Sequence, residues 1–154
     1  MLTLILLTIA GLAVTPAASA LIQVDRGIAG ARIDNTKAQV RAALGQPTRV
    51  SNGTNEFGPF TVFRYRGGIR VTFQGRTRVT AVSTTGLGDR TARGVGVGST
   101  GRAVRNRVPG VTCEPVPGGR RICQTGTGNP GQRITAFFIR NGRVTSVTVG
   151  RVID

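Results

Sequence analysis

The clearest hydrophobic pattern in the chain lies within residues 35–47. Apolar side chains recur there at helical spacing and share one face: Val40, Ala43 and Leu44. Thr36 and Gln39 have the spacing of a capping box, in which each side chain accepts the other residue's backbone N–H. Gly45 suits the left-handed position after a helix, and Pro47 prevents continuation. The pattern predicts a short helix that must lie on another element, because so short a helix is marginal alone.

Strand patterns follow this helix. Residues 60–66 and 78–84 are both rich in strand-forming side chains. Between them, apolar and polar positions alternate, with Ile69, Val71 and Phe73 set against Arg70, Thr72 and Gln74. Glycines after residues 66 and 74 supply the turns. We expect an antiparallel meander with one face against the helix and the other toward solvent.

The second half shows a similar order of elements. Residues 100–108 predict a weaker helix, since Gly101 costs roughly 1 kcal/mol relative to alanine in a helix interior. A hairpin is expected over residues 111–124, and further strands over residues 134–139 and 143–152. Asn141-Gly142 between those last strands is typical of a two-residue type I′ turn.

Two parts of the chain match one another at a nearly fixed spacing. Six residues recur 64 positions later: Asp25, Arg26, Gly30, Thr36, Val40 and Arg41 as Asp89, Arg90, Gly94, Thr100, Val104 and Arg105. Six more recur 65 positions later: Ile69, Phe73, Arg78, Val79, Thr80 and Val82 as Ile134, Phe138, Arg143, Val144, Thr145 and Val147. A fixed period indicates a repeated structural unit. We predict an α+β fold of two tandem helix-plus-antiparallel-sheet repeats, residues 21–88 and 89–154, with the helices on one face of the sheet.

The first twenty residues have the organisation of a signal peptide. Residues 2–14 form an uncharged apolar run, and Ala18-Ser19-Ala20 matches an A-x-A cleavage site, which predicts a mature start at Leu21. The run is shorter than the roughly 20 residues that cross a bilayer, so we expect no transmembrane span after cleavage. No Lys or Arg precedes the run, and an uncleaved anchor is therefore the alternative. The protein is expected to be exported, either secreted or held in the cell envelope.

The net positive charge of the chain indicates that its partner is acidic. The chain has 21 Lys and Arg against 6 Asp and Glu, a formal net charge of +15, and Lys37 is its one lysine. Such a charge attracts acidic proteins, anionic envelope polymers or nucleic acid. The arginines are scattered from Arg26 to Arg151, and an exported protein has little access to nucleic acid. We expect an acidic protein or an anionic polymer as the partner, and no nucleic acid.

The two cysteines predict a disulfide. Cys113 and Cys123 flank the turn signal Pro117-Gly118-Gly119, and cysteines of exported proteins are commonly bridged. A bridge would join the two arms of the hairpin and stabilise the fold by about 2–3 kcal/mol through the unfolded state. The C-x-x-C spacing typical of redox catalysis is absent.

The chain has few residues suited to catalysis or to binding a cofactor. The chain has no histidine, which excludes Ser-His-Asp and Cys-His arrangements and imidazole ligation of a metal. The six carboxylates are dispersed, and the equivalent Asp25 and Asp89 suggest a shared structural role such as pairing with a neighbouring arginine. Residues 96–101 satisfy G-x-G-x-x-G but lie outside the βαβ context that a dinucleotide site requires. We expect no enzyme activity, cofactor or metal.

Residues 33–47 resemble the signature of SmpA/OmlA (BamE-like) envelope modules, in which a Thr, a Val and a Leu-Gly-x-Pro ending precede strands. A tandem, exported, disulfide-containing pair of such modules is similar in architecture to the β-lactamase-inhibitory protein family. That resemblance implies helices behind a curved antiparallel sheet whose concave face grips a partner.

The solvent face of the predicted sheet is the candidate binding site. Strand alternation assigns these side chains to it: Arg64, Arg66, Arg70, Thr72, Thr135 and Phe137. The alternative is a face that is merely solvated. We expect an exported, monomeric, non-catalytic binding or scaffold protein of the bacterial cell envelope that presents this basic face to its partner. A secreted inhibitor of a hydrolase such as a β-lactamase is the alternative, and a small hydrolase with an unrecognised site is a third hypothesis.

Overall fold

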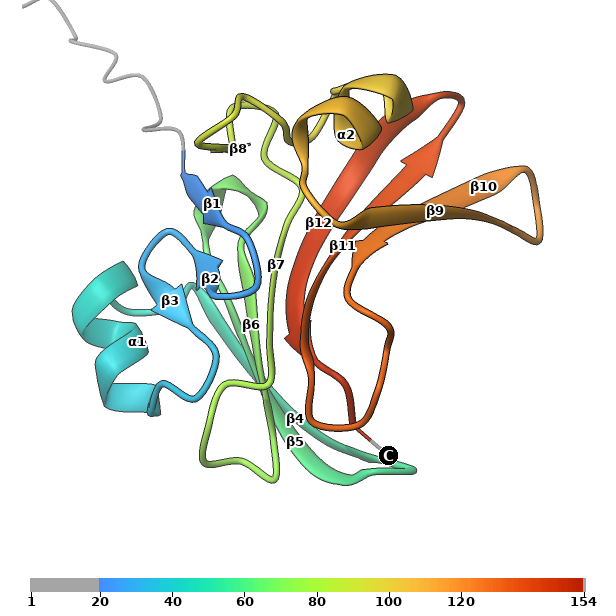
Figure 1. The fold of residues 1–154 in the computed structure, drawn as a ribbon. Coiled ribbons are helices and arrows are strands. Elements are labelled where there is room, and N and C mark those ends of the chain that lie inside the picture. The colour runs from blue at the N-terminus through green and yellow to red at the C-terminus, as the bar shows by residue number, and fades with distance from the viewer. Residues whose placement is uncertain (1–19, 154) are drawn as a thin grey trace, which may run out of the picture.

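A computed structural model describes residues 20–153 (Figure 1). The predicted signal peptide, residues 1–20, falls almost entirely outside this range. Within the range, no helix is both long enough and apolar enough to cross a membrane.

The main element of the fold is an antiparallel sheet of eight strands, four from each half of the chain. The first half supplies β4 (Arg49–Asn55), β5 (Gly58–Arg64), β6 (Arg70–Gln74) and β7 (Ala81–Thr84). The second half supplies β9 (Val111–Val116), β10 (Arg120–Thr125), β11 (Arg133–Arg140) and β12 (Arg143–Arg151). Their order is β4-β5-β6-β7-β12-β11-β10-β9, so β7 and β12 join the two halves at the centre.

A second, four-stranded sheet also draws on both halves. Its strands are β1 (Leu21–Gln23), β2 (Gly27–Ile28), β3 (Ala31–Arg32) and β8 (Arg90–Thr91), in the order β3-β2-β1-β8. β1 pairs antiparallel with β2 but parallel with β8, which comes nearly seventy residues later. The glycines and alternating small residues of positions 21–33 favour a lead-in strand or an extended arm, and β1, β2 and β3 lie within that stretch.

Two short helices complete the fold. α1 (Lys37–Leu44) begins at Thr36, whose side chain accepts the Gln39 N–H while the Gln39 side chain accepts the Thr36 N–H, so the predicted capping box is confirmed. Gly45 ends α1 with a φ of 77°. α2 (Gly101–Arg107) is capped by the Thr100 hydroxyl, which accepts the Ala103 N–H. A 3-10 turn, η1 (Arg66–Gly68), joins β5 to β6.

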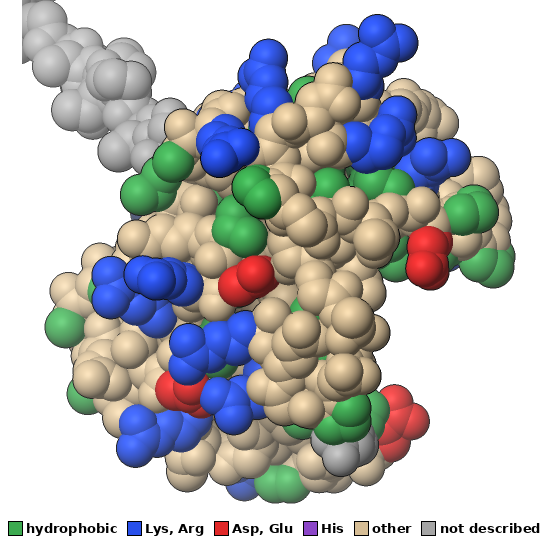
Figure 2. Space-filling view, in the orientation of Figure 1, with side chains coloured by type: hydrophobic (Ala, Val, Ile, Leu, Met, Phe, Trp, Pro, Cys, Tyr) green, Lys and Arg blue, Asp and Glu red, His purple; other side chains and the backbone are tan. Residues whose placement is uncertain are grey.

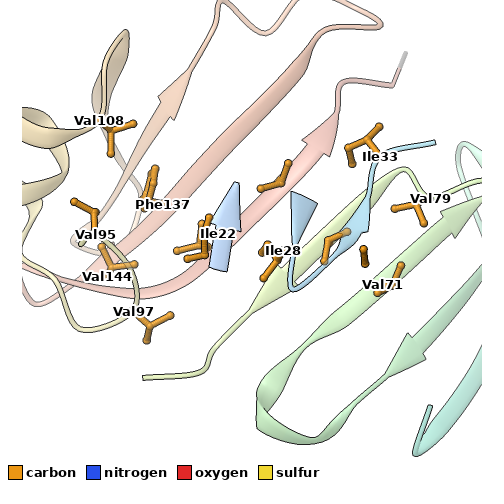
Figure 3. Close-up of a cluster of buried hydrophobic side chains, with 14 of the residues drawn as sticks. Ile22, Ile28, Ile33, Val71, Val79, Val95, Val97, Val108, Phe137 and Val144 are labelled. Carbon is orange, nitrogen blue, oxygen red and sulfur yellow. The ribbon is translucent and has the colours of Figure 1, made fainter. Parts of the chain in front are cut away.

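The hydrophobic core lies on one face of the eight-stranded sheet. Ile22 of β1 and Ile28 of β2, both at most 1% exposed, lie at its centre. Figure 3 shows Val95, Val144 and Phe137 on one side of this pair and Val71, Val79 and Ile33 on the other. The short N-terminal strands are therefore the bridge between the apolar side chains of the two halves.

The predicted fold class is wrong. The structure is mostly β, with 49% strand and 13% helix, and its two sheets each mix strands from both halves instead of forming two helix-plus-sheet repeats. The small sheet lies between the two helices and covers the middle of the large sheet, which the prediction assigned to the helices (Figure 1). The physical reason is strand pairing across the halves, because pairing β7 with β12 satisfies two strand edges that separate units would leave open.

Asp25 fastens the N-terminal strands to the second half. Its carboxylate Oδ1 accepts the hydroxyls of Thr125 at 2.5 Å and Thr135 at 2.8 Å. Its backbone N–H donates to the Thr135 hydroxyl at 2.7 Å, and the Thr135 N–H donates to the Thr125 hydroxyl at 2.8 Å. Together, these four hydrogen bonds join the loop that follows β1 to β10 and β11 of the second half.

Asp89 makes the reciprocal connection. Its carboxylate accepts the hydroxyl of Thr84 in β7 and the backbone N–H of Ala20, the latter at 2.8 Å. Asp89 is 6% exposed and Thr84 is fully buried. The predicted pairing of these two aspartates with neighbouring arginines is wrong, since threonine hydroxyls and backbone N–H groups satisfy both carboxylates.

The predicted disulfide is confirmed. Cys113 and Cys123 are bonded and stand directly opposite one another on β9 and β10. Asn141 and Gly142 both have positive φ, 51° and 75°, as the predicted type I′ turn requires. The sequence pattern missed β4 and the two-residue β8.

We expect replacement of both cysteines by alanine to lower the free energy of unfolding by about 2–3 kcal/mol, because the bridge closes a short loop in the unfolded chain. Urea denaturation followed by circular dichroism measures this loss. A reducing agent should destabilise the unsubstituted protein by a similar amount and leave the double variant unchanged. Equal stability of the two proteins without reductant would contradict the expectation.

Asp25→Asn should destabilise the fold by about 1–3 kcal/mol, because a neutral amide oxygen accepts the two threonine hydroxyls more weakly than the charged carboxylate does. Thermal unfolding of this variant is compared with that of Glu114→Gln, which makes the same chemical change at an exposed position. Equal melting temperatures for the two variants would show that the Asp25 cluster contributes nothing.

Candidate binding surface

The eight-stranded sheet has a covered and an uncovered face. The covered face carries the core side chains of Phe63, Val71 and Val82, and α1 packs there with the Arg41 guanidinium 4.8 Å from the centre of the Phe63 ring. We call the opposite side the outer face. Strand alternation places on it the residues that lie between the core positions.

Three arginines stand in a line on the outer face. Arg49 of β4 is directly opposite Arg64 of β5, and Arg64 is directly opposite Arg70 of β6. Directly opposed residues on antiparallel strands share a face and have adjacent side chains. We call Arg49, Arg64 and Arg70 the arginine row.

The arginine row continues across the remaining strands as uncharged side chains. Arg70 is opposite Ser83 of β7, and Ser83 is opposite Thr148 of β12. Ala136, Gln124 and Thr112 extend the same line to the far edge of the sheet. The positive charge of this line is therefore concentrated at the β4–β6 end.

In the part of the chain that the structure describes, no Asp or Glu forms a salt bridge with the arginine row. Within residues 20–153 both salt bridges are formed by Asp34, with Arg133 at 2.8 Å and Arg151 at 2.6 Å. The Nε atom of Arg64 is buried and has no hydrogen-bond acceptor in the described part of the chain. Like charges directly opposite one another destabilise a sheet, so the row costs stability that an anion bound to it would offset.

A hollow of about 430 Å³ lies beside the row. It is lined by Arg64, Tyr65, Arg70, Ser83 and Thr148, and the hydroxyl groups of Ser83 and Thr148 are neutral donors. Burial raises the pKa of the Tyr65 hydroxyl, against an opposing effect of the Arg41 charge, and this hydroxyl donates to the Gly45 carbonyl oxygen at 3.3 Å next to α1. The hollow thus combines two guanidinium groups with neutral hydroxyl groups, a set of donors suited to anionic oxygens.

The outer face also carries apolar surface in the second half. Phe138 of β11 is 37% exposed and borders a neighbouring hollow of about 410 Å³. Arg120 and Arg140 line that hollow, and Ser146 lines it as well as the first one. The two hollows therefore adjoin over β12.

The structure brings together some of the predicted site residues and separates others. Arg64, Arg70 and Thr72 lie on the outer face, and Arg66 is exposed in η1 beside it. The placement of Thr135 and Phe137 on the solvent face is wrong, since both are fully buried. Thr135 bonds Asp25, and Phe137 packs in the core opposite Cys123.

The error arises from a one-residue ambiguity in β11. Its apolar run Ala136-Phe137-Phe138-Ile139 puts hydrophobic side chains on both faces, so alternation does not identify the buried one. Phe138 is the exposed member of the pair. Arg49 was missed because its strand is polar, and only the register of β4 with β5 reveals its place beside Arg64.

Among residues 20–153, no three His, Cys, Asp or Glu side chains come together in a way that could hold a metal ion. Two of the glycines in residues 96–101 have structural roles. A Cβ on Gly96 would lie 1.8 Å from the Asp89 carbonyl oxygen, and Gly98 has a φ of 88°.

No protein-family model and no curated protein matches this sequence. Among solved structures, the fold is similar to that of an extracellular protein containing an SCP domain from Bacillus anthracis, with a TM-score of 0.53 and 10% identity. That match covers 77% of this chain but 44% of the Bacillus anthracis chain, so this chain spans less than half of its length.

A second similar structure is a DUF4309 family protein from Bacillus subtilis, with a TM-score of 0.51 and 20% identity over 79% of this chain and 82% of that one. Both likenesses concern the fold alone. Neither protein is described as an SmpA/OmlA module or a β-lactamase inhibitor, and the resemblance inferred from the sequence stays a prediction.

Arg70→Thr should raise the free energy of unfolding by about 0.2–1 kcal/mol at low ionic strength, because it removes a like charge opposite Arg64. The gain should shrink as salt screens the repulsion. Arg32→Thr in β3 is the control, since Arg32 is also an exposed strand residue but lies opposite Gly27. Urea denaturation at low and high salt gives both values, and an equal gain in the two variants would contradict a repulsive row.

Proposed function

We propose that this protein is an exported, non-catalytic binding protein of the cell envelope whose outer face binds an anionic polymer. The observation that carries the proposal is the arginine row, with three arginines opposed on adjacent strands and no salt bridge to any of them within residues 20–153. An anion that lies along the row supplies the missing charge.

The chemistry of the outer face favours a polymer over a compact protein epitope. Protein interfaces concentrate their binding energy in Trp, Tyr and Arg anchors. This chain has no Trp, its one tyrosine is Tyr65, and the exposed aromatic on the outer face of the second half is Phe138. A row of arginines with hydroxyl groups beyond it instead suits a linear ligand with repeated charges. An acidic protein is the competing outcome, and no specific feature of the face favours a β-lactamase.

The disulfide bond supports the proposal that the protein is exported. A disulfide such as Cys113–Cys123 is typical of proteins outside the reducing cytosol, so the bond supports export. One protein of similar fold is described as extracellular. Retention in the envelope, as opposed to release into the medium, is part of the proposal and follows from binding to an immobile polymer.

The proposal predicts that Arg64→Glu/Arg70→Glu weakens binding to poly(glycerol phosphate) by about 10-fold or more. Each lost ion pair contributes up to about 1 kcal/mol, and each new carboxylate repels the polymer. Fluorescence anisotropy of end-labelled polymer measures the dissociation constant. Poly-L-glutamate in a parallel titration tests whether a carboxylate polymer substitutes for a phosphodiester.

The matched control is Arg32→Glu/Arg76→Glu, which lowers the formal net charge by the same four units, from +15 to +11, at two exposed positions outside the row. This control should retain most of the affinity. Equal losses in the two double variants would mean that net charge, and not the outer face, determines binding. Failure of the unsubstituted protein to bind either polymer would overturn the proposal.

A further inference from the structure

A separate cleft lies between α2 and the β9–β10 hairpin. Its volume is about 950 Å³, which is the upper end of the range of about 300–1,000 Å³ common for small-molecule sites. One wall is α2, the other is the hairpin, and the turn between β11 and β12 contributes Gly142. Figure 2 shows Lys and Arg side chains gathered over α2 and beside the hairpin.

Four arginines line this cleft. Arg102 and Arg105 are three positions apart on α2 and therefore lie on one side of the helix. Arg120 and Arg121 are consecutive residues of β10 on the facing wall, so their side chains leave opposite faces of the strand, Arg121 on the side of Ile139 and Arg120 on the side of Arg140. All four are exposed, and none of the residues that line the cleft is Asp or Glu.

The hairpin holds one of these arginines in place. The Arg120 Nε donates to the Pro117 carbonyl oxygen at 3.1 Å, which leaves its terminal N–H groups for another acceptor. The Cys113–Cys123 disulfide joins the two strands of the hairpin, so this wall is covalently closed. Apolar side chains between the arginines, namely Pro115, Val116 and Ile139, provide a surface for an uncharged group.

We propose that this cleft binds a small organic phosphate. Arg102, Arg105 and Arg121 bring three guanidinium groups to one space, more positive charge than a single carboxylate can neutralise, whereas a phosphate group carries up to two negative charges and three acceptor oxygens. Guanidinium groups bind phosphate oxygens in a bidentate manner. The volume leaves room beyond the phosphate for an organic portion that packs on Val116 and Ile139.

This site is distinct from the arginine row. Arg49, Arg64 and Arg70 do not line the cleft, and none of the four cleft arginines lines the hollow beside the row. Arg120 and Arg121 also line the second outer-face hollow, whereas Arg102 and Arg105 line neither outer-face hollow. The inference therefore goes beyond the proposed function, and either can fail without the other.

Isothermal titration of the purified protein with inorganic pyrophosphate and with glucose 1-phosphate tests the inference. Arg105→Glu should weaken binding of each probe by about 10-fold, since it removes a charge-assisted contact and adds a repulsive charge. The matched control is Arg107→Glu, because Arg107 is also in the last turn of α2 but lines a different hollow. Arg121→Glu, on the opposite wall, should reproduce the loss without altering the helix.

The result that supports the site is weaker binding in Arg105→Glu and Arg121→Glu, with affinity within about twofold of the original in Arg107→Glu and in Arg64→Glu/Arg70→Glu. Citrate, a carboxylate probe of similar charge, should bind more weakly than pyrophosphate. Equal losses in the variants and controls, tighter binding of citrate, or no heat with either phosphate up to about 10 mM, a concentration that detects even weak sites, would overturn the inference.

Discussion

Hydrogen bonds from threonine hydroxyls to two carboxylates hold the N-terminal strands against one face of the eight-stranded sheet, and so leave the opposite face without these strands. Asp25 bonds Thr125 and Thr135 of the second half, and Asp89 bonds Thr84 of the first. A hydrogen bond to a charged group contributes about 1.5–3 kcal/mol, and an unsatisfied buried carboxylate would cost more than that. These bonds hold the N-terminal strands on the inner face, where Ile22 and Ile28 join the two sets of core side chains. The outer face remains without a covering layer of its own.

The arginines on the outer face lower the local stability of the sheet, and a bound anion would offset that loss. Arg64 lies directly between Arg49 and Arg70. In a sheet selected only for stability, we would expect uncharged polar or acidic residues at the two flanking positions. Repulsion of this kind is typical of sites that gain from a ligand what they lose in its absence. The cleft beside α2 differs in form, because its arginines come from two elements, α2 and the β9–β10 hairpin, on opposite walls of one space. A shallow row suits an extended polymer, and a cleft suits a compact ligand.

Local signals in the sequence predicted the local structure well. The capping box at Thr36 and Gln39, the Asn141-Gly142 turn and the Cys113–Cys123 bridge depend on a few neighbouring residues, and each is present. The fold class was wrong because the pairings of β7 with β12 and β1 with β8 join distant residues whose register no local pattern specifies. Of the candidate binding surface, the sequence pattern placed some residues on the correct face and others on the wrong one. Arg64 and Arg70 follow from alternation with Phe63 and Val71, whereas Phe137 and Phe138 are chemically identical and only packing distinguishes them.

The central claim is that the uncovered face of the eight-stranded sheet, through its arginine row, is where the anionic partner binds. Modification of arginine by phenylglyoxal, read by peptide mass spectrometry with and without poly(glycerol phosphate), tests this claim directly because arginines are distributed over the whole surface. The account predicts that the polymer protects Arg49, Arg64 and Arg70 while Arg32 and Arg76 react as before. Uniform protection of all arginines, or protection that leaves the row reactive, would contradict it.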